Sequence, residues 1–96
     1  MRIQMMLVAL AFAASSALSA QTPVEQGKTL MDARRYSDAQ TLLQPLGKSD
    51  ATAAFYLGQI AMEQNNGGKA VDWFERAVQL SPRNSVYYDW LGRAYG

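Results

Sequence analysis

Apolar residues recur along this chain at spacings of three and four, which place them on one face of an α-helix. The pattern is clearest in residues 51–64, where Ala54, Leu57, Gly58 and Ala61 fall at i, i+3, i+4 and i+7. The same spacing returns before and after this segment. No window alternates with the two-residue period of a β-strand over a useful length. The pattern therefore predicts an all-α protein.

Capping residues and a proline delimit the first two helices. Thr22 is followed by Pro23 and then by Glu25, which makes a capping box with proline at the first helical position. The helix that starts there should fade at the Arg-Arg pair. Residues 37–40 (SDAQ) form a second box, which predicts that the next helix begins with them. Pro45 has no N–H to donate and should weaken the last turn of that helix.

Turn residues separate the three remaining helices. Asp50 is expected to cap the helix that carries the clearest pattern. Residues 65–68 (NNGG) should then break the chain, because Asn and Gly best tolerate positive φ. Helical spacing resumes over residues 69–80 and stops at Pro82, which disfavours helical geometry in the residue before it. A last helix is predicted over residues 85–95.

The first nineteen residues have the three parts of a secretory signal peptide. Arg2 supplies a positive charge, residues 5–14 (MMLVALAFAA) are apolar, and residues 15–20 (SSALSA) are small enough for signal peptidase. A membrane-spanning helix needs roughly 20 apolar residues, and this run is shorter. We expect a signal peptide over residues 1–19, cleaved near residues 17–20. We therefore expect the protein to be exported, to the periplasm or outside the cell, and the style of the signal suggests a bacterial protein.

Composition narrows the function further. The chain has no cysteine and no histidine, so disulfides and thiol catalysis are excluded. Without Arg2 the nine basic residues become eight, which balance the eight acidic ones. No basic stripe suggests nucleic acid or an anionic membrane surface. A nucleophile needs a base and an orienting group, and no spacing nominates such a set. We therefore expect no catalytic residue, no cofactor and no metal site.

The helical pattern also repeats. Gly58 and Ala70 are twelve residues apart, as are Gly27 and Ala39, and Gly92 opens a third copy. Small residues at these positions would let two helix axes approach closely. A single helical hairpin cannot bury its apolar face alone, so neighbouring hairpins must stack to form a continuous core.

Residues 51–84 resemble the tetratricopeptide repeat, a helix–turn–helix unit of 34 residues. The residues that match the family pattern are Leu57, Gly58, Ala70, Phe74, Ala77 and Pro82. Ala54 and Ala61 depart from it, since the family usually has larger residues there. The longer Sel-type helical repeats share the second-helix sequence of residues 73–77 (WFERA) and rank second.

The resemblance implies a fold and a division of the chain. We expect antiparallel helix–turn–helix repeats stacked as a short right-handed α-solenoid of about two and a half repeats. Residues 20–50 would be a degenerate first repeat, residues 51–84 a complete one, and residues 85–96 the first helix of a truncated third. The two tryptophans, Trp73 and Trp90, are expected in packing between repeats rather than in a ligand cage.

The resemblance also implies a non-enzymatic scaffold that binds a protein segment on the concave face, which the first helices line. The family's partner-contacting positions here are Val24, Lys28, Met31, Phe55, Gln59, Met62, Asp89 and Arg93, accompanied by Asp32, Thr52, Glu63 and Val86. This mixture suits an apolar segment of a partner. The alternative is that Phe55 and Met62 merely pack against a neighbouring helix. The family's clamp for a C-terminal carboxylate needs a lysine and an asparagine four residues apart, which no repeat here has.

The incomplete third unit leaves several alternatives for how the apolar end of the array is covered and for what the protein does. The third unit stops after one helix, and Tyr88, Leu91 and Tyr95 would present apolar surface where repeat arrays need a polar face. We expect either a fragment of a longer repeat protein or an end that a partner or a second copy covers. Accordingly, the alternative functions are a self-associating structural subunit of an envelope complex and the targeting module of a longer enzyme.

Overall fold

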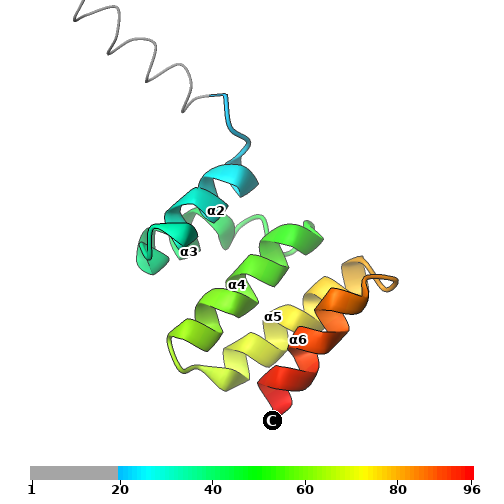
Figure 1. The fold of residues 1–96 in the computed structure, drawn as a ribbon. Helices are drawn as coiled ribbons and strands as arrows, with labels where there is room; N and C mark the ends of the chain where they lie inside the picture. Colours follow the sequence, from blue (N-terminus) through cyan, green and yellow to red (C-terminus); the bar gives the residue numbers. More distant parts are fainter. Residues whose placement is uncertain (1–19) are drawn as a thin grey trace, which may run out of the picture.

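The computed structural model describes residues 20–96, and within that range it contains five α-helices and no strand (Figure 1). The helices are α2 (Pro23–Asp32), α3 (Tyr36–Leu43), α4 (Ala51–Glu63), α5 (Gly67–Leu80) and α6 (Ser85–Tyr95). The all-α prediction is confirmed. The predicted signal peptide, residues 1–19, lies outside the described residues.

Several helix ends lie where the local signals predict them. The Thr22 hydroxyl accepts a hydrogen bond from the Glu25 N–H at 3.2 Å, which caps α2. The Asp50 carboxylate caps α4 by accepting from the Ala53 N–H at 2.9 Å. The helix α3 ends two residues before Pro45, and α6 has the predicted bounds. These ends follow from backbone groups that need a hydrogen-bond partner at each helix terminus.

The start of α3 differs from the prediction. The helix begins at Tyr36, and the residue at its N-cap, Arg35, makes no side-chain cap, so Ser37 lies inside the first turn. The Asp38 carboxylate instead pairs with the Arg35 guanidinium at 2.6 Å. The turn before it is made by Arg34 with φ of 62°, so the chain reverses within three residues. The predicted capping box is therefore wrong, because Ser37 lies inside the first turn and not at the N-cap position that a capping box requires.

The turn before α5 also differs. The glycines Gly67 and Gly68 are the first two residues of the helix and have negative φ, so α5 begins two residues earlier than predicted. The left-handed position is Asn65, with φ of 56°. The side chain of Asn66 caps the helix by accepting from the Lys69 N–H at 3.2 Å. Asn65 therefore provides the left-handed turn and Asn66 provides the helix cap, whereas the two glycines belong to the helix itself.

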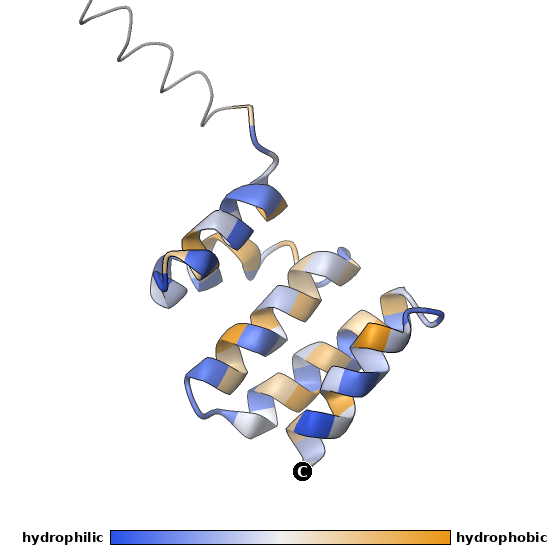
Figure 2. Ribbon diagram, in the orientation of Figure 1, coloured by the Kyte–Doolittle hydropathy of each residue, from blue (hydrophilic) through white to orange (hydrophobic). Residues whose placement is uncertain are grey.

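The helices form two antiparallel hairpins and one added helix. The helix α2 packs on α3, α4 packs on α5, and α6 packs on the other side of α5. Contacts of α4 with α2 and α3 join the hairpins. In Figure 1, α2, α4 and α6 form the layer nearer the viewer. Figure 2 shows that the helices carry both hydrophobic and hydrophilic residues along their length.

Glycines mark the crossing points of both hairpins. A Cβ atom at Gly27 would lie 2.6 Å from Leu43 Cγ, and one at Gly58 would lie 2.5 Å from Phe74 Cδ1. Leu43 and Phe74 are themselves fully buried. Only a residue without a side chain allows this approach, as the small-residue pattern predicts. Each hairpin is therefore closed by one large apolar side chain seated over one glycine.

The link between the hairpins packs against α5. A Cβ atom at Gly47 would lie 2.6 Å from both Leu57 Cδ1 and Trp73 Cζ3. The Arg76 guanidinium donates to the Lys48 carbonyl oxygen at 2.9 Å through Nε. Trp73 is thus a packing residue between repeats, as the sequence predicts.

Candidate functional site

Two hollows follow one another along the surface formed by α2, α4 and α6. The first, which we call the α2–α4 hollow, has a volume of about 430 Å³ and is lined by Val24 and Lys28 of α2 and by Thr52 and Tyr56 of α4. The second, which we call the Trp90 hollow, has a volume of about 190 Å³. Its lining residues are Met31, Asp32, Tyr36, Gln59, Glu63 and Trp90.

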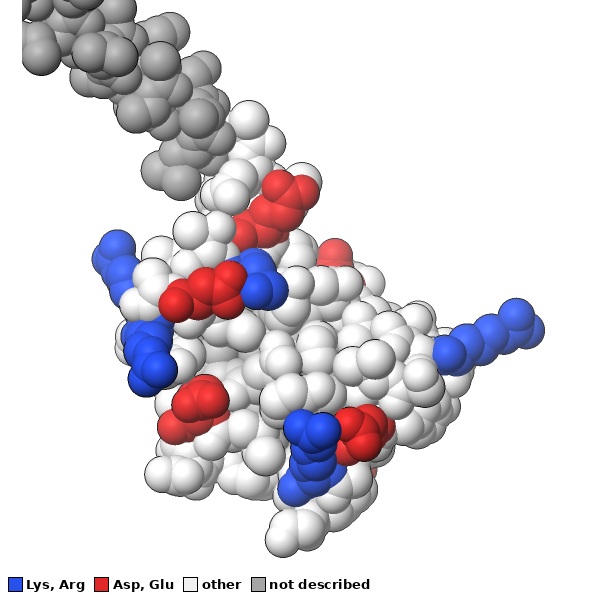
Figure 3. All heavy atoms as spheres, viewed as in Figure 1, with Lys and Arg blue, Asp and Glu red and all other residues white. Residues whose placement is uncertain are grey.

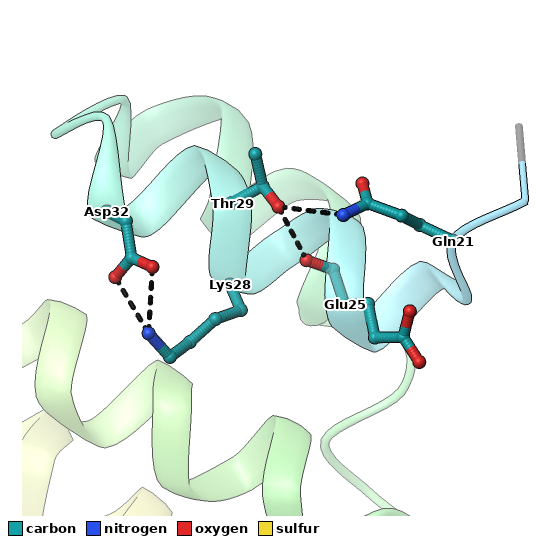
Figure 4. A network of polar contacts seen from close by, with 5 residues as sticks. All are labelled: Gln21, Glu25, Lys28, Thr29 and Asp32. Carbon is teal, nitrogen blue, oxygen red and sulfur yellow. Dashed lines mark hydrogen bonds and ion pairs between the residues drawn. The ribbon is translucent and has the colours of Figure 1, made fainter. Parts of the chain in front are cut away.

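Polar contacts on α2 border the α2–α4 hollow (Figure 4). The Lys28 ammonium group lies 2.8 Å from Asp32 Oδ2 and 2.9 Å from Oδ1. The hydrogen bond to Asp32 is the main reason that the pKa of Lys28 is raised. The Thr29 hydroxyl donates to the Glu25 carbonyl oxygen at 3.1 Å and accepts from the Gln21 amide at 3.2 Å. The rim of this hollow is therefore already hydrogen-bonded within the chain.

Trp90 has two neighbourhoods. Its indole packs edge-on against Phe55 and at a tilt against Phe74, with ring centroids 5.9 Å apart in both cases. The Arg93 guanidinium carbon lies 5.0 Å from the indole centroid, within cation–π range. The tryptophan also lines the hollow that bears its name. It therefore packs between repeats, as predicted, and contributes an aromatic surface to the candidate site.

The predicted partner-contacting residues are distributed over four settings. Val24 and Lys28 line the α2–α4 hollow, while Met31 and Gln59 line the Trp90 hollow. Phe55 and Met62 pack against the buried cluster around Ala61 and Phe74. Asp89 and Arg93 form an exposed ion pair of 3.1 Å on α6. Their part in binding a partner stays a prediction.

The packing of Phe55 has a specific cause. Its ring centroid lies 4.8 Å from that of Tyr87, which α6 brings against α4. Phe55 is thus half-buried among aromatic rings from three helices. The alternative considered for Phe55, packing against a neighbouring helix, is the setting that the structure shows.

Three aromatic residues of the hollows were not among the predicted contacts: Tyr36, Tyr56 and Trp90. For Tyr56 a signal was present, because Thr52, Tyr56, Gln59 and Glu63 follow the helical spacing of four, three and four. That spacing places them on one face of α4. No helical spacing in the sequence marks Tyr36 as a lining residue. It is the first residue of α3, and the turn between α2 and α3 places it beside the hollow.

Charge around the hollows is unevenly distributed. The carboxylates of Asp32 and Glu63 line the Trp90 hollow, and no lysine or arginine does. Figure 3 shows the same side of the molecule, with acidic and basic side chains toward its periphery and a largely uncharged centre. Within residues 20–96 no three metal-ligating side chains gather as a metal site would require. None of the helices in this range has the length and apolarity to cross a membrane.

Stacked antiparallel hairpins that cross at small residues define the class of helical repeat proteins. A family model described as Tetratricopeptide repeat matches residues 24–85, which is more than half of the 96 residues. The chain therefore belongs to the tetratricopeptide repeat family. Tetratricopeptide repeats generally mediate protein–protein interaction and are typically non-catalytic. No curated protein and no solved structure matches the chain.

Proposed function

We propose that this chain is a non-enzymatic scaffold that binds a segment of a protein partner along α2, α4 and α6. The observation that supports this most directly is the succession of two hollows along one pair of helices. Seven residues separate Val24 from Met31 and Thr52 from Gln59, the lining residues of the two hollows. At roughly 1.5 Å per residue the hollows are about 10 Å apart.

That separation suggests how a partner lies. Residues i and i+3 of a segment in the extended polyproline II conformation are also about 10 Å apart and point to the same side, because this helix has three residues per turn and advances roughly 3.1 Å per residue. An extended segment would therefore place one side chain in each hollow and leave the two residues between them over the Lys28–Asp32 pair. The partner class we propose is an extended peptide segment with two anchors three residues apart.

The lining of each hollow suggests its anchor. The Trp90 hollow combines the apolar surfaces of Met31 and Trp90 with the carboxylate of Glu63, while the Asp32 carboxylate beside it is already paired with Lys28. A lysine or arginine matches this lining, because its stem is apolar and its head is cationic. The α2–α4 hollow offers Val24 and the Tyr56 ring, which suit an apolar side chain. The proposed segment therefore has a basic residue and an apolar residue three positions apart.

A random peptide library tests this proposal. Selection on the purified chain should enrich peptides with a basic and an apolar residue three positions apart. Glu63→Lys should weaken an enriched peptide by about tenfold or more, because it places a positive charge in the Trp90 hollow. Asp72→Lys is the matched control, since it makes the same change of charge at an exposed position of α5 outside both hollows. Enrichment without basic residues, or equal loss in both variants, would contradict the proposal.

Export is part of the proposed function. We propose that residues 1–19 direct the chain through the secretory pathway, so that the scaffold acts in the periplasm or outside the cell. The support is the charged, apolar and small-residue order of that segment. Expression in a bacterial host with the native N-terminus, followed by mass determination of the exported chain, tests it. The expected mass corresponds to cleavage near residues 17–20, and an uncleaved cytoplasmic chain would be evidence against export.

A second candidate function is assembly through self-association, as a structural subunit. The observation that favours it is the exposed apolar side of α6, where Tyr88 and Tyr95 are 48% and 66% exposed. This candidate uses a different surface from the hollows, so the two functions can coexist.

A further inference from the structure

A third hollow lies between the second helices of the two hairpins. This α3–α5 hollow has a volume of about 340 Å³ and shares no lining residue with the other two. Three of its lining side chains are cationic: Lys48 from the link between the hairpins, and Lys69 and Arg76 from α5. One acidic side chain, Asp72, lies among them. The fold thus gathers basic residues that the sequence scatters, because the link at Lys48 is bonded to α5.

The positive charge of this hollow is not neutralised by ion pairs. Within residues 20–96 the ion pairs use Lys28, Arg35 and Arg93 as their cations, and none of these lines the hollow. Three basic side chains against one acidic side chain leave an excess of two positive charges. The Trp90 hollow, by contrast, has acidic lining residues and no basic one. The two sites therefore favour ligands of opposite charge.

Arg76 is held in place without a ligand. Its guanidinium donates to the Lys48 carbonyl oxygen through Nε at 2.9 Å and through Nη2 at 2.5 Å, and Nη1 donates to Gln79 Oε1 at 3.3 Å. Both acceptor groups are neutral, so the side chain is fixed while its charge stays uncompensated. The guanidinium has more N–H groups than these bonds use, so it can still donate to an anion. A fixed cation loses little conformational freedom when it binds.

The uncharged lining residues match a peptide better than a simple anion. Gln40 and Gln44 are four residues apart at the end of α3, and both line the hollow. Each side-chain amide donates and accepts hydrogen bonds, as the peptide groups of a partner also do. Trp73 is half-buried and adds an aromatic surface to the lining. The hollow therefore offers partners to a peptide backbone as well as to its charged side chains.

We propose that the α3–α5 hollow binds an acidic segment of a protein partner, with one carboxylate at Lys69 and another at Arg76 and Lys48. Lys69 and Arg76 are seven residues apart on α5. At roughly 1.5 Å per residue they are about 10 Å apart. Residues i and i+3 of a polyproline II segment are separated by about 9 Å. Two acidic residues three positions apart therefore reach both cations and place no charge over Asp72, which lies between them.

Fluorescence anisotropy with two labelled peptides tests this site. The probe is Ala-Glu-Pro-Pro-Glu-Ala, whose prolines favour polyproline II, and the reference peptide has glutamine in place of both glutamates. The purified, exported chain should bind the probe at least about tenfold more tightly than the reference. Lys69→Gln should weaken binding of the probe by about fivefold or more, and Asp72→Asn should strengthen it. Arg83→Gln is the matched control, since it removes a positive charge from an exposed position outside all three hollows.

Several outcomes would overturn the proposal. One is equal binding of the two peptides, or no binding of the probe at chain concentrations up to about 1 mM. Another is equal weakening by Lys69→Gln and Arg83→Gln, because the attraction would then depend on net charge alone. Displacement of the probe by an equal concentration of inorganic phosphate would identify a phosphate site instead. Retention of the chain on vesicles of phosphatidylglycerol, lost in Lys69→Gln, would identify a membrane surface instead.

The α3–α5 hollow and the proposed peptide site on the other layer can be tested separately. A basic peptide selected for the Trp90 hollow should bind Lys69→Gln and the parent chain equally, because Lys69 does not line that hollow. The acidic probe should in turn bind Glu63→Lys within about twofold of the parent. A failure of one site is therefore distinct from a failure of the other.

Discussion

The α2–α3 hairpin and the α4–α5 hairpin are closed by the same kind of contact, a glycine on one helix under a large side chain on the other. They differ in what surrounds that contact. Phe74 over Gly58 belongs to an aromatic cluster with Phe55 and Trp90, in helices of 13 and 14 residues. Leu43 over Gly27 closes helices of 10 and 8 residues.

The turns of the two hairpins differ as well. Each contains one residue in the left-handed region, Arg34 in the first and Asn65 in the second. Asparagine tolerates that region better than arginine, because its short side chain bonds locally. The following helix is capped by Asn66 in the second hairpin and by no side chain in the first. One repeat architecture is therefore built here with strong local support in the second hairpin and weak local support in the first.

The largest effect is expected at the contact that closes the second hairpin. Phe74→Ala removes a fully buried ring from over Gly58 and should lower the free energy of unfolding by about 4 kcal/mol. A helical domain of this size has roughly 3–5 kcal/mol in total, so the variant should be largely unfolded. Circular dichroism during urea titration measures this. A cooperative transition close to that of the parent would mean that Phe74 is not central.

The corresponding change in the first hairpin should be less severe. Leu43→Ala removes the buried side chain over Gly27 and should cost about 2–3 kcal/mol. Because α6 packs on α5 and not on the first hairpin, amide hydrogen exchange should accelerate in α2 and α3 before α4 to α6. Uniform acceleration over all five helices would show that the hairpins unfold together, and would remove the difference in local support.

A stabilising change can test the turns. Arg34→Gly relieves a left-handed conformation that glycine adopts freely, and should raise the free energy of unfolding by about 1 kcal/mol. Asn65→Gly is the matched variant at the equivalent position and should change it by less than about half as much. Thermal unfolding of both variants measures the difference. Equal effects would mean that arginine and asparagine are equally strained there.

The same comparison shows what the sequence can predict. A helix end depends mainly on the residues next to it. Thr22 and Asp50 therefore predict the starts of α2 and α4, and Pro82 predicts the end of α5. The start of α3 differs from the prediction because the chain reverses at Arg34 and the helix begins at Tyr36 without a side-chain cap, which places Ser37 inside its first turn. The fold was predictable because the 34-residue period records how hairpins stack.

The hollows were less predictable than the helices. A repeat register tells which residues share a face, but not how far a neighbouring helix reaches across that face. Phe55 occupies a partner position of the family, yet Tyr87 and Trp90 of α6 cover it. Only the crossing of α4 and α6 decides this, and that crossing is not a local property of the sequence. The register therefore gives helices that line the hollows, but only some of the lining residues.

The smallest effect concerns the bond that ties α6 to the second hairpin. The Tyr95 hydroxyl donates to Glu75, and this hydrogen bond is the main reason that the pKa of Tyr95 is raised above its usual value of 10.0. A raised pKa stabilises the protonated folded state, so the contribution is present below pH 10 and is lost as the pH rises through the folded pKa. The first hairpin has no such tie to α6.

Absorbance titration of tyrosinate measures this effect, with Tyr95→Phe identifying the signal of Tyr95 among five tyrosines. Glu75→Gln should lower the pKa of Tyr95 toward its usual value, because the charged acceptor is removed. Trp90 fluorescence should report loosening of α6 as the parent chain titrates above pH 10, and this change should be absent in Tyr95→Phe. An unchanged titration in Glu75→Gln would show that α6 is held by its apolar side alone, against Phe74 and its neighbours.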